Sequence, residues 1–557
     1  MAHCHPDSGT RPSPPAPVPL PPTATGTPIV SNIAHNSVRP IQTLALVALL
    51  ALLGACSSLP TDFDKPVSHV LEDTSQSELS QTVQPLLERN PGKSGFRTLG
   101  TGEAAFIARL RLIQSAEQSL DIQYYIWHDD LTGRTLFNQL LAAADRGVRV
   151  RILLDDLDTA GKDEILRTID AHPKVEIRVY NPFANRDNRV RDFAGDTRRI
   201  NRRMHNKTLT ADNIVTIFGG RNIGDEYFAA ATDVGFGDMD ALAIGPIADE
   251  VSAQFDLYWN SAWAYPITAF DWEEPVTAAD FAAFRANSDQ FLEEVRVSDY
   301  AEVIRQFDEA TLATIDEIDW VWSEWLLAYD QPSKVTARKV AADTHLAPKI
   351  KMGMDRTQRD LIIVSPYFVP GEEFTDYLVS LVDRGVRVRI LTNSLQANDV
   401  SLVHAGYMRY RKPLVRGGVE LYEYKADANK TVRKQREDQR DKNRIGASRA
   451  SLHAKFFGFD ETYLFIGSFN LDGRSVALNS ELGAYYASPE EALALSEFFD
   501  QAAYDIAYRV HLDGDDKLEW VTMRDGREIH LDREPDTSWW KRFSTGLLRY
   551  IVPESQL

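Results

Sequence analysis

The sequence DRGVRVRIL occurs twice in this chain, at residues 145–153 and again at residues 383–391. Each time it follows a segment in which apolar residues have helical spacing, and it begins a run in which valine and isoleucine alternate with arginine, as is typical of a strand. Gly147 and Gly385 stand where those helices would end. We therefore predict that each nonapeptide joins the end of a helix to a central strand, and that the chain contains two copies of one domain.

The segments around the two nonapeptides repeat in the same order. In the first half SLDIQYYIW, GVRVRILLDD and VEIRVYNPF have the composition of strands, and DLIIVSPYFVP, GVRVRILTNS and GVELYEYK match them in the second half. Segments with helical spacing, such as GEAAFIARLRLIQSAEQ and FTDYLVSLVDRG, precede or separate them. Strands that alternate with helices indicate the α/β class, and we predict two fused domains, each a mixed, largely parallel sheet flanked by helices.

Composition divides the chain into six parts. The stretch IDEIDWVWSEWLLAYDQ has no counterpart in the repeat and is expected to be helical, and KLEWVTMRDGREIHLD alternates around Asp525-Gly526 like a β-hairpin. The predicted parts are an N-terminal extension with a signal peptide (1–55), a tether (56–95), the first domain (96–265), a helical segment between the domains (266–345), the second domain (346–512), and a hairpin with an amphipathic tail (513–557).

Charge and cysteine content narrow the classes of partner. The chain has 557 residues and a net charge of −20. Nucleic-acid backbones require a positive footprint, so no nucleic-acid partner is expected. The two cysteines, Cys4 and Cys56, exclude a disulfide framework. No cluster of histidine, cysteine and carboxylate residues has convincing metal-ligand spacing, so neither a metal nor another cofactor is expected.

Cys56 ends a short apolar segment of the kind found in secretory signal peptides. The run LALVALLALL at residues 44–53 is uncharged and shorter than the roughly 20 residues that span a bilayer. LGAC at residues 53–56 resembles the bacterial lipobox, whose cysteine is acylated; an ordinary secretory signal with a chance cysteine is the alternative. We expect a lipid-anchored protein of the bacterial cell envelope that faces the periplasm, at the outer or the inner membrane.

The pattern His-x-Lys-x-x-x-x-Asp occurs once in each copy of the repeat. An apolar strand, a glycine and an asparagine follow it, and then an acidic residue opens another apolar stretch. The members are His205, Lys207 and Asp212 in the first copy, followed by Asn222 and Asp240, and His453, Lys455 and Asp460 in the second copy, followed by Asn470 and Glu481. Two such sets in matching places of duplicated domains point to one shared site.

These residue types suit phosphoryl chemistry. On a strand, a histidine and a lysine two residues apart point to the same side, so both motifs would face one cleft between domains related by a pseudo-twofold axis. One imidazole would attack phosphorus while the other protonates the leaving oxygen. The lysines and asparagines would neutralise and hydrogen-bond the phosphate oxygens, and Asp240 and Glu481 would each orient an imidazole.

The duplicated motif resembles that of the phospholipase D superfamily, and within it the chain closely resembles the bacterial cardiolipin synthase C type. The shared patterns run from about residue 96 to the C-terminus and include QYYIWHDDLTGR, INRRMHNK, GGRNIGDEYF, SPYFVP, LTNSLQANDVSLVHAGY and SLHAKFFGFD. The resemblance implies a phosphohistidine mechanism at a phosphodiester. By family habit His205 would be the nucleophile and His453 the acid, although the sequence does not rank them.

The resemblance also implies phospholipid substrates. C-type members take the phosphatidyl group from phosphatidylethanolamine, and phosphatidylglycerol as acceptor then gives cardiolipin. With water as acceptor the enzyme would be a phospholipase D that makes phosphatidic acid. The donor, the acceptor, the balance of transfer and hydrolysis, and the need for an accessory protein stay open. A nuclease and a non-catalytic lipid-binding lipoprotein are the remaining rivals.

Three residues and three segments are weaker candidates. Tyr125 and Tyr367 end matched strands, where α/β sheets bind ligands, and His404 could reach the acceptor; core packing or a helix surface is the alternative for each. The basic stretches at residues 189–203 and 430–444 are interpreted as solvated loops, with contact to anionic lipid head groups as the alternative. The tail DTSWWKRFSTGLLRYIVPE combines aromatic and basic residues and is expected at a membrane surface, with docking on the domains as the alternative.

Overall fold

The computed structural model describes residues 58–231, 234–270, 272, 274–311, 314–335, 344–428, 449–524 and 526–549. All of them belong to the second of the two units into which the chain divides, Ser57–Leu557. The predicted signal peptide, Cys56 and the basic stretch at residues 430–444 lie outside the described residues. Within the described part, no helix combines the length and the apolarity that a membrane span requires.

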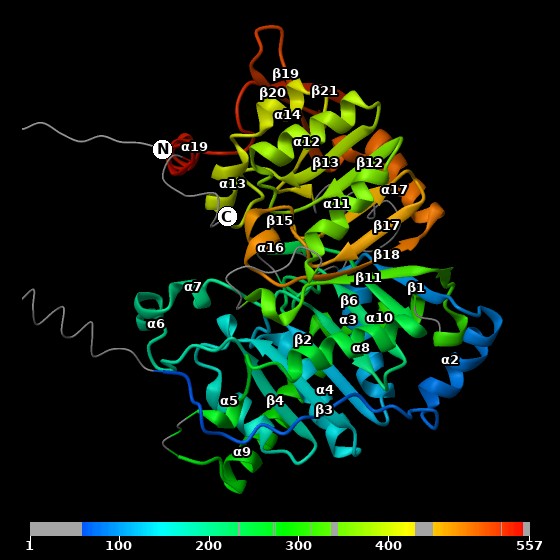
Figure 1. Cartoon of the computed structure of the whole chain (residues 1–557), viewed down its shortest axis with the longest axis vertical. Coiled ribbons are helices and arrows are strands. Elements are labelled where there is room, and N and C mark those ends of the chain that lie inside the picture. The colour runs from blue at the N-terminus through cyan, green and yellow to red at the C-terminus, as the bar shows by residue number, and fades with distance from the viewer. Residues whose placement is uncertain are drawn as a thin grey trace, which may run out of the picture. The chain divides into compact units, whose positions relative to one another are not determined.

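The first half of the chain forms one mixed sheet of nine strands (Figure 1). In spatial order the strands are β10 (Val321–Ser323), β1 (Ser94–Leu99), β8 (Asp240–Ile244), β6 (Val215–Gly219), β5 (Thr208–Ala211), β2 (Ser119–Tyr124), β3 (Arg149–Asp155), β4 (Val175–Tyr180) and β9 (Ala264–Pro266). The neighbours β2, β3 and β4 are parallel, and the other pairs are antiparallel. A mixed, largely parallel sheet was predicted; the sheet is mixed, but its parallel pairing is confined to these three strands.

Helices cover both faces of this sheet. They are α2 (Glu78–Arg89), α3 (Gly102–Ser115), α4 (Leu131–Asp145), α5 (Asp163–Asp170) and α8 (Pro246–Trp259), with the short α6 (Val190–Gly195) and α7 (Thr197–Ile200) before the first motif. Ile152 and Leu154 of β3 belong to the apolar cluster that contains α3 and α4, whereas Leu153 packs with Phe255 of α8. Successive side chains of a strand point to opposite faces, so a strand covered on both sides needs the continuous apolar run found here.

The second half forms a mixed sheet of ten strands with the same parallel centre. In spatial order these are β11 (Trp325–Tyr329), β18 (Leu482–Ala487), β17 (Tyr463–Gly467), β16 (Phe456–Phe459), β12 (Asp360–Val364), β13 (Arg387–Asn393), β14 (Glu420–Tyr424), β19 (Ala507–Leu512), β20 (Leu518–Arg524) and β21 (Arg527–Leu531). Its helices are α11 (Leu346–Arg356), α12 (Gly371–Asp383), α13 (Ser401–Tyr407), α14 (Arg411–Arg416), α16 (Gly473–Ala477), α17 (Pro489–Gln501), α18 (Ala503–Ile506) and α19 (Trp539–Leu548). The predicted C-terminal hairpin is confirmed, because β20 pairs with β21.

The repeated nonapeptide has the predicted structure. α4 ends at Asp145 before β3, and α12 ends at Asp383 before β13, so each nonapeptide contains the end of a helix and the beginning of a strand. Gly147 and Gly385 have φ angles of +103° and +89°. Residues with a Cβ rarely adopt this left-handed region, which explains why both turns contain glycine.

The segment between the two domains is only partly helical. α9 (Ala278–Arg296) and α10 (Asp299–Thr311) agree with the helical prediction, but IDEIDWVWSEWLLAYDQ does not. After one turn of 3-10 helix it forms β10 and β11, which pair with β1 and β18 at the edges of the two sheets. The helix prediction is wrong for this stretch, because its aromatic side chains suit a strand and the open sheet edges supply partners for its backbone.

The two halves share buried contacts. β7 (Val234–Gly237) of the first half pairs in parallel with β15 (Arg449–Leu452) of the second. An apolar cluster also crosses between the halves, and in it the ring of Phe96 stacks on that of Tyr486 with centroids 4.3 Å apart. The β7–β15 pair brings the segment that leads into the second motif alongside the first domain.

Candidate active site

The histidine of the first motif was predicted to lie on a strand, but it lies three residues before β5. The side chain of His205 is buried, and its backbone N–H donates to the carbonyl of Ser480 at 2.8 Å. Its Nδ1 lies 2.8 Å from Oε2 of Glu481, a residue of the second copy. The carboxylate of Glu481 also accepts hydrogen bonds from the hydroxyls of Ser468 and Ser475. Glu481 therefore lies where the sequence predicted it, beside an imidazole, in a fixed orientation.

The histidine of the second motif has a matching environment. The backbone N–H of His453 donates to the carbonyl of Gly237 at 2.8 Å, and its Nδ1 lies 2.5 Å from Oδ2 of Asp238. Both of these partners belong to the first copy. Each copy thus supplies the carboxylate that holds the other copy's histidine.

Asp240, the carboxylate predicted to hold the second imidazole, is engaged elsewhere. It forms ion pairs with the buried side chains of Arg109 and Arg221, with N–O distances of 2.9 and 3.2 Å. These contacts fix the start of β8 beside α3. The prediction for Asp240 is therefore wrong, and Asp238, which sequence reasoning missed, takes its place.

Sheet register explains the error. Gly219 of β6 pairs with Asp240, and the matching Gly467 of β17 pairs with Gly483. Two residues before these partners come Asp238 and Glu481, so these two carboxylates are the equivalent pair. The sequence FGDMD offers two aspartates, and only the strand pairing distinguishes them.

The two lysines of the motifs are buried beside the histidines. The Nζ of each donates to the carbonyl of the histidine two residues earlier, and Nζ of Lys455 also lies 3.0 and 3.1 Å from the ring nitrogens of His453. Burial lowers the pKa of Lys455 to about 8 and that of Lys207 well below its usual value, although Asp238 and Glu481 act in the opposite direction. Burial therefore disfavours the charged form of both lysines, and an anionic ligand would stabilise that form.

The imidazoles and lysines of the two copies influence one another. Burial lowers the pKa of His205 and that of His453, and the lysines of both copies lower it further. Burial raises the pKa of Glu481 to about 7, whereas the charge and hydrogen bond of His453 outweigh burial and hold the pKa of Asp238 well below its usual range. The ionised Asp238 opposes this lowering at His453, whereas Glu481, with its raised pKa, does less to stabilise a charge on His205.

The aspartates of the two motifs bind backbone N–H groups at the start of a neighbouring strand. The carboxylate of Asp212 accepts hydrogen bonds from the backbone N–H groups of residues 117, 118 and 119, at 2.8 to 3.1 Å. Asp460 accepts the equivalent bonds from residues 358 to 360. Both residues therefore tie a turn of the motif to the start of a central strand, and their place among the catalytic residues stays a prediction.

The two predicted asparagines are buried and keep an amide oxygen without a hydrogen bond among the described residues. The amide Nδ2 of Asn222 donates to the hydroxyl of Tyr227 at 2.9 Å, and the backbone N–H of Asn470 donates to Ser475. Amide oxygen and nitrogen are assigned from such networks. A buried amide end without a protein partner is available to a polar ligand such as a phosphate.

Aromatic rings surround both imidazoles. The ring of Tyr125 meets that of His205 edge-on with centroids 4.8 Å apart, and Tyr367 approaches His453 at 6.5 Å. Tyr227 and Phe236 lie 5.1 and 5.3 Å from His453, and the sequence analysis did not identify either of them. These rings exclude water from the histidines, and the two tyrosines predicted to line a pocket lie beside the motifs.

His404 lies away from this site. Its fully buried imidazole contacts Arg411 at 2.7 Å, and Glu534 lies 3.7 Å away. The prediction that His404 reaches an acceptor is therefore wrong. Its place in a buried charged cluster beneath α13 could not be read from the helical spacing of the sequence.

Comparison with known proteins identifies the family. The family described as "Cardiolipin synthase, PLD-like domain" matches the chain twice, over residues 110–259 and 350–503. The chain belongs to this family. Each match contains one complete His-x-Lys-x-x-x-x-Asp motif, and the resemblance to the phospholipase D superfamily is confirmed.

Named relatives cover most of this phospholipase D-like chain. It is 42% identical over 479 residues to "Cardiolipin synthase C" of Escherichia coli, and the matched residues cover 86% of this chain and 99% of that protein. It is 26% identical over 446 residues to "Cardiolipin synthase B" of the same species, with 80% and 84% coverage. The crystal structure of phosphatidylserine synthase from Haemophilus influenzae has a TM-score of 0.52 at 14% identity and covers 86% of this chain and all of that chain, which shows a shared fold.

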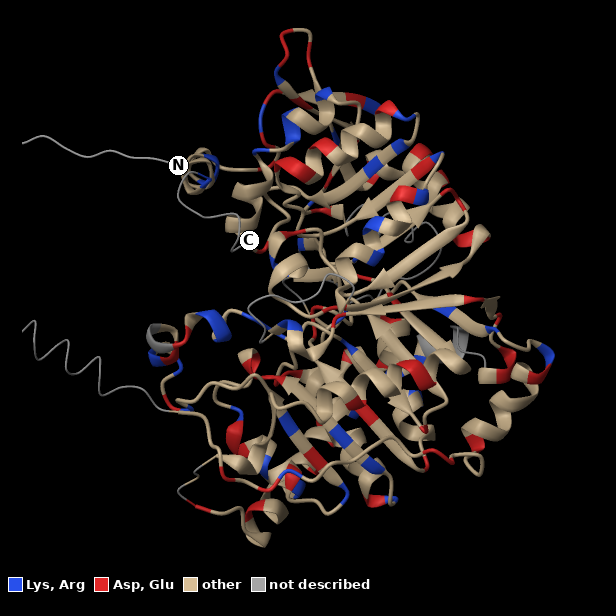
Figure 2. Ribbon diagram, in the orientation of Figure 1, with Lys and Arg blue, Asp and Glu red and all other residues tan. Residues whose placement is uncertain are grey.

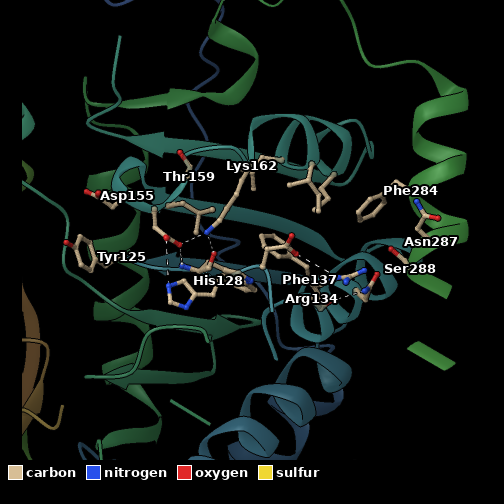
Figure 3. A pocket seen from close by; sticks show the side chains of 18 residues that line it. Tyr125, His128, Arg134, Phe137, Asp155, Thr159, Lys162, Phe284, Asn287 and Ser288 are labelled. Carbon is tan, nitrogen blue, oxygen red and sulfur yellow. Dashed lines mark hydrogen bonds and ion pairs between the residues drawn. The ribbon is translucent and has the colours of Figure 1, made fainter. Parts of the chain in front are cut away.

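A cavity of about 280 Å³ adjoins the phospholipase D-like site (Figure 3). Tyr125 and Asp155 lie at one end of it, and Phe284 and Asn287 of α9 lie at the other. Between them the wall combines apolar side chains of α5 with charged groups, which include Asp158 and Lys162. Tyr125 also touches the ring of His205, but no residue of the two motifs lines the cavity.

Among the described residues, two groups of side chains lie close enough to share a metal ion. One consists of His511, Glu519 and His530, and the other of His128, Asp130 and Glu226. Neither group contains a residue of the phospholipase D motifs. Neither group takes part in the mechanism proposed for the two motif histidines.

Proposed function

We propose that this chain is a phosphatidyltransferase that makes cardiolipin from membrane phospholipids through a phosphohistidine intermediate. The observation that carries the proposal is the pair of buried imidazoles, each held at Nδ1 by a carboxylate from the opposite copy. The names of the relatives, cardiolipin synthases B and C, support the choice of product. Phosphatidylethanolamine and phosphatidylglycerol are the proposed donor and acceptor.

In the first step His205 is the nucleophile. Glu481 holds its Nδ1, so the lone pair of Nε2 attacks phosphorus, and a P–N bond forms while the P–O bond to the head group breaks. The imidazolium of His453, stabilised by Asp238, gives its proton to the leaving oxygen. The ammonium groups of Lys207 and Lys455 stabilise the charge that develops on the non-bridging oxygens.

In the second step the roles reverse. His453, now neutral, accepts the proton of an incoming hydroxyl, whose oxygen attacks phosphorus as the P–N bond breaks and His205 is regenerated. A hydroxyl of phosphatidylglycerol gives cardiolipin, whereas water gives phosphatidic acid. The aromatic rings around the imidazoles support transfer over hydrolysis, because they exclude water.

A lipid assay tests this proposal. Membranes that carry the wild-type chain or its His205→Ala variant receive labelled phosphatidylethanolamine and phosphatidylglycerol, and mass spectrometry resolves the products. We expect labelled cardiolipin from the wild type alone. Phosphatidic acid without cardiolipin would change the assignment to a phospholipase D, and product formation by His205→Ala would contradict the phosphohistidine.

We also propose that the chain is exported and acylated at Cys56, which anchors it to a bacterial envelope membrane facing the periplasm. The lipobox-like LGAC sequence supports this location. Labelled palmitate should enter the wild-type chain and not Cys56→Ser, and labelling of both would contradict the anchor. Purified protein in defined vesicles would show whether an accessory protein is required: we expect turnover without one.

A further inference from the structure

Helix α19 presents an exposed apolar face. The exposed fractions of Trp539, Trp540, Phe543 and Leu547 are 65%, 65%, 51% and 53%. Their spacing places them on one side of the helix, and the rings of Trp539 and Phe543 stack with centroids 5.3 Å apart. The opposite face packs on the protein, where Thr545 is buried. So large an aromatic patch on one short helix indicates a binding surface.

A second exposed apolar pair lies in the other half of the molecule. Val190 and Phe193 of α6 are 76% and 45% exposed. In Figure 1, α6 and α19 project from the same side of the molecule, one from each half. Together Val190, Phe193, Trp539, Trp540, Phe543 and Leu547 form what we call the apolar rim.

Each part of the rim is linked to a motif histidine, one through the chain and the other through hydrogen bonds. α6 is followed by α7, which ends at Ile200, five residues before His205. On the other side, Nζ of Lys541 in α19 donates to the side chain of Gln396 at 3.2 Å, and Arg449 donates to the backbone carbonyl of the same residue. Arg449 opens β15, the strand that leads into His453. The rim therefore lies beside the chain segments that enter the site from each half.

Basic residues surround the rim although the whole chain has a net charge of −20. Residues 538–549 contain Lys541, Arg542 and Arg549 and no acidic residue. Residues 186–203 contain seven arginines, of which four form ion pairs with aspartates, and Arg191 and Arg198 are exposed. In Figure 2 the ribbon is blue, the colour of lysine and arginine, at positions on α19 and around α6 and α7. Tryptophan with lysine and arginine is the combination that binds the interface of an anionic bilayer.

We propose that the apolar rim docks the protein on an anionic phospholipid bilayer, with α6 of the first half and α19 of the second inserted into it. Docking in this way delivers phospholipid to the two histidines without complete extraction into water. The inference deepens the proposed function, from which it takes the choice of a lipid surface as partner.

A dye placed on the rim tests docking without relying on activity or on the lipid anchor. Cys4 and Cys56 are replaced by serine in the full chain, and Leu547→Cys carries an environment-sensitive fluorophore. The matched control is Leu493→Cys on α17, which is 45% exposed and lies on the other side of Figure 1. We expect a blue shift at Leu547→Cys when vesicles containing phosphatidylglycerol are added, little shift with phosphatidylcholine vesicles, and none at Leu493→Cys.

Other occupants of the rim give different results. A blue shift that grows with protein concentration in the absence of vesicles would show a second copy of the chain, and a shift independent of both would show a segment of the same chain. An equal shift at both dye positions would show adsorption without orientation. Each of these outcomes overturns the proposal.

Activity gives an independent measure. Trp539→Ser combined with Phe543→Ser should lower turnover of vesicle substrate about tenfold or more, because each aromatic ring loses a favourable transfer to the interface. The same variant should act normally on a short-chain phospholipid dissolved below its micelle concentration. Equal loss on both substrates would contradict docking. Absence of turnover by the wild type on either substrate would instead contradict the proposed function and leave the dye result standing.

Discussion

The two motif histidines lie beside carboxylates whose pKa values are shifted in opposite directions. Asp238 stays ionised beside His453 because the imidazole's charge and hydrogen bond hold the carboxyl pKa down, whereas burial raises the pKa of Glu481 beside His205 to about 7. A proton donor needs the first environment and a nucleophile needs the second. This difference, invisible in two identical motifs, gives a structural reason to assign the nucleophile to the first copy.

The assignment predicts unequal effects of two conservative substitutions. Asp238→Asn keeps the size of the side chain and removes the charge that stabilises the imidazolium of His453, so release of the head group should slow by about 100-fold or more. Glu481→Gln should slow this step less, because His205 reacts as a neutral imidazole. Rapid-quench measurement of labelled head-group release compares the two. Equal losses, or a larger loss in Glu481→Gln, would reverse the roles of the histidines.

Loss of the proton from Lys455 should limit activity at alkaline pH. Burial lowers its pKa to about 8, so in the free enzyme the ammonium loses its proton, and the phosphate loses a cation, as the pH rises through about 8. We expect kcat/KM to fall across this range. Because burial also lowers the pKa of Lys207, the test uses Lys207→Arg combined with Lys455→Arg; both guanidinium groups stay charged, so whatever the maximal rate of this variant, the decline should move to higher pH. A pH profile of kcat/KM with an unchanged alkaline limb in the variant would contradict this origin.

At the scale of elements, the lysine and the aspartate of each His-x-Lys-x-x-x-x-Asp motif have different roles. The lysine, two residues after the histidine, stays at the site, whereas the aspartate lies at the turn that follows β5 or β16 and fixes the start of β2 or β12. The motif is therefore both a catalytic group and a clamp between neighbouring strands.

The clamp predicts a loss of stability without a loss of chemistry. Asp212→Ala leaves three backbone N–H groups without their charged acceptor, which should lower the free energy of unfolding by about 3 kcal/mol. Urea denaturation measures this change. The kcat of the folded fraction should stay within about twofold of the wild type. If activity fell while stability did not, Asp212 would belong to the catalytic machinery after all.

The sequence predicts the elements better than it predicts side-chain partners. The repeated nonapeptide, the central strands and the C-terminal hairpin follow from spacing and turn residues, which are local signals. The edge strands in IDEIDWVWSEWLLAYDQ were missed because their partners, β1 and β18, are distant in sequence. The same reason applies to Asp240, predicted to hold an imidazole, and to His404, predicted to reach a ligand: strand register and burial decide these contacts, and neither can be read from neighbouring residues.

At the scale of the whole molecule, the active site exists only where the two halves meet. Gly237 and Asp238 hold His453, and Ser480 and Glu481 hold His205, so each half completes the other. The parallel pair of β7 and β15 fixes this arrangement. Neither half contains a motif histidine together with the carboxylate that holds it.

This exchange predicts the behaviour of a divided chain. A break after Glu324, between β10 and β11, would give pieces that each keep all the strands of one sheet. We expect no cardiolipin synthesis from either piece alone and measurable synthesis when both are expressed together. His205→Ala in the first piece should abolish the restored activity. Activity of a single piece would show that one copy can assemble a site by itself.

The exchanged carboxylates also constrain how such a chain can change over generations. A single copy with this arrangement would have had to form a dimer, in which each chain supplied the carboxylate for the other chain's histidine. Gene duplication and fusion would then preserve an existing contact rather than create a new one. Once fused, the copies were free to differ, and the aspartate beside one histidine and the glutamate beside the other record that divergence. Selection at either histidine therefore acts on residues of the opposite copy, and the two halves must be inherited together.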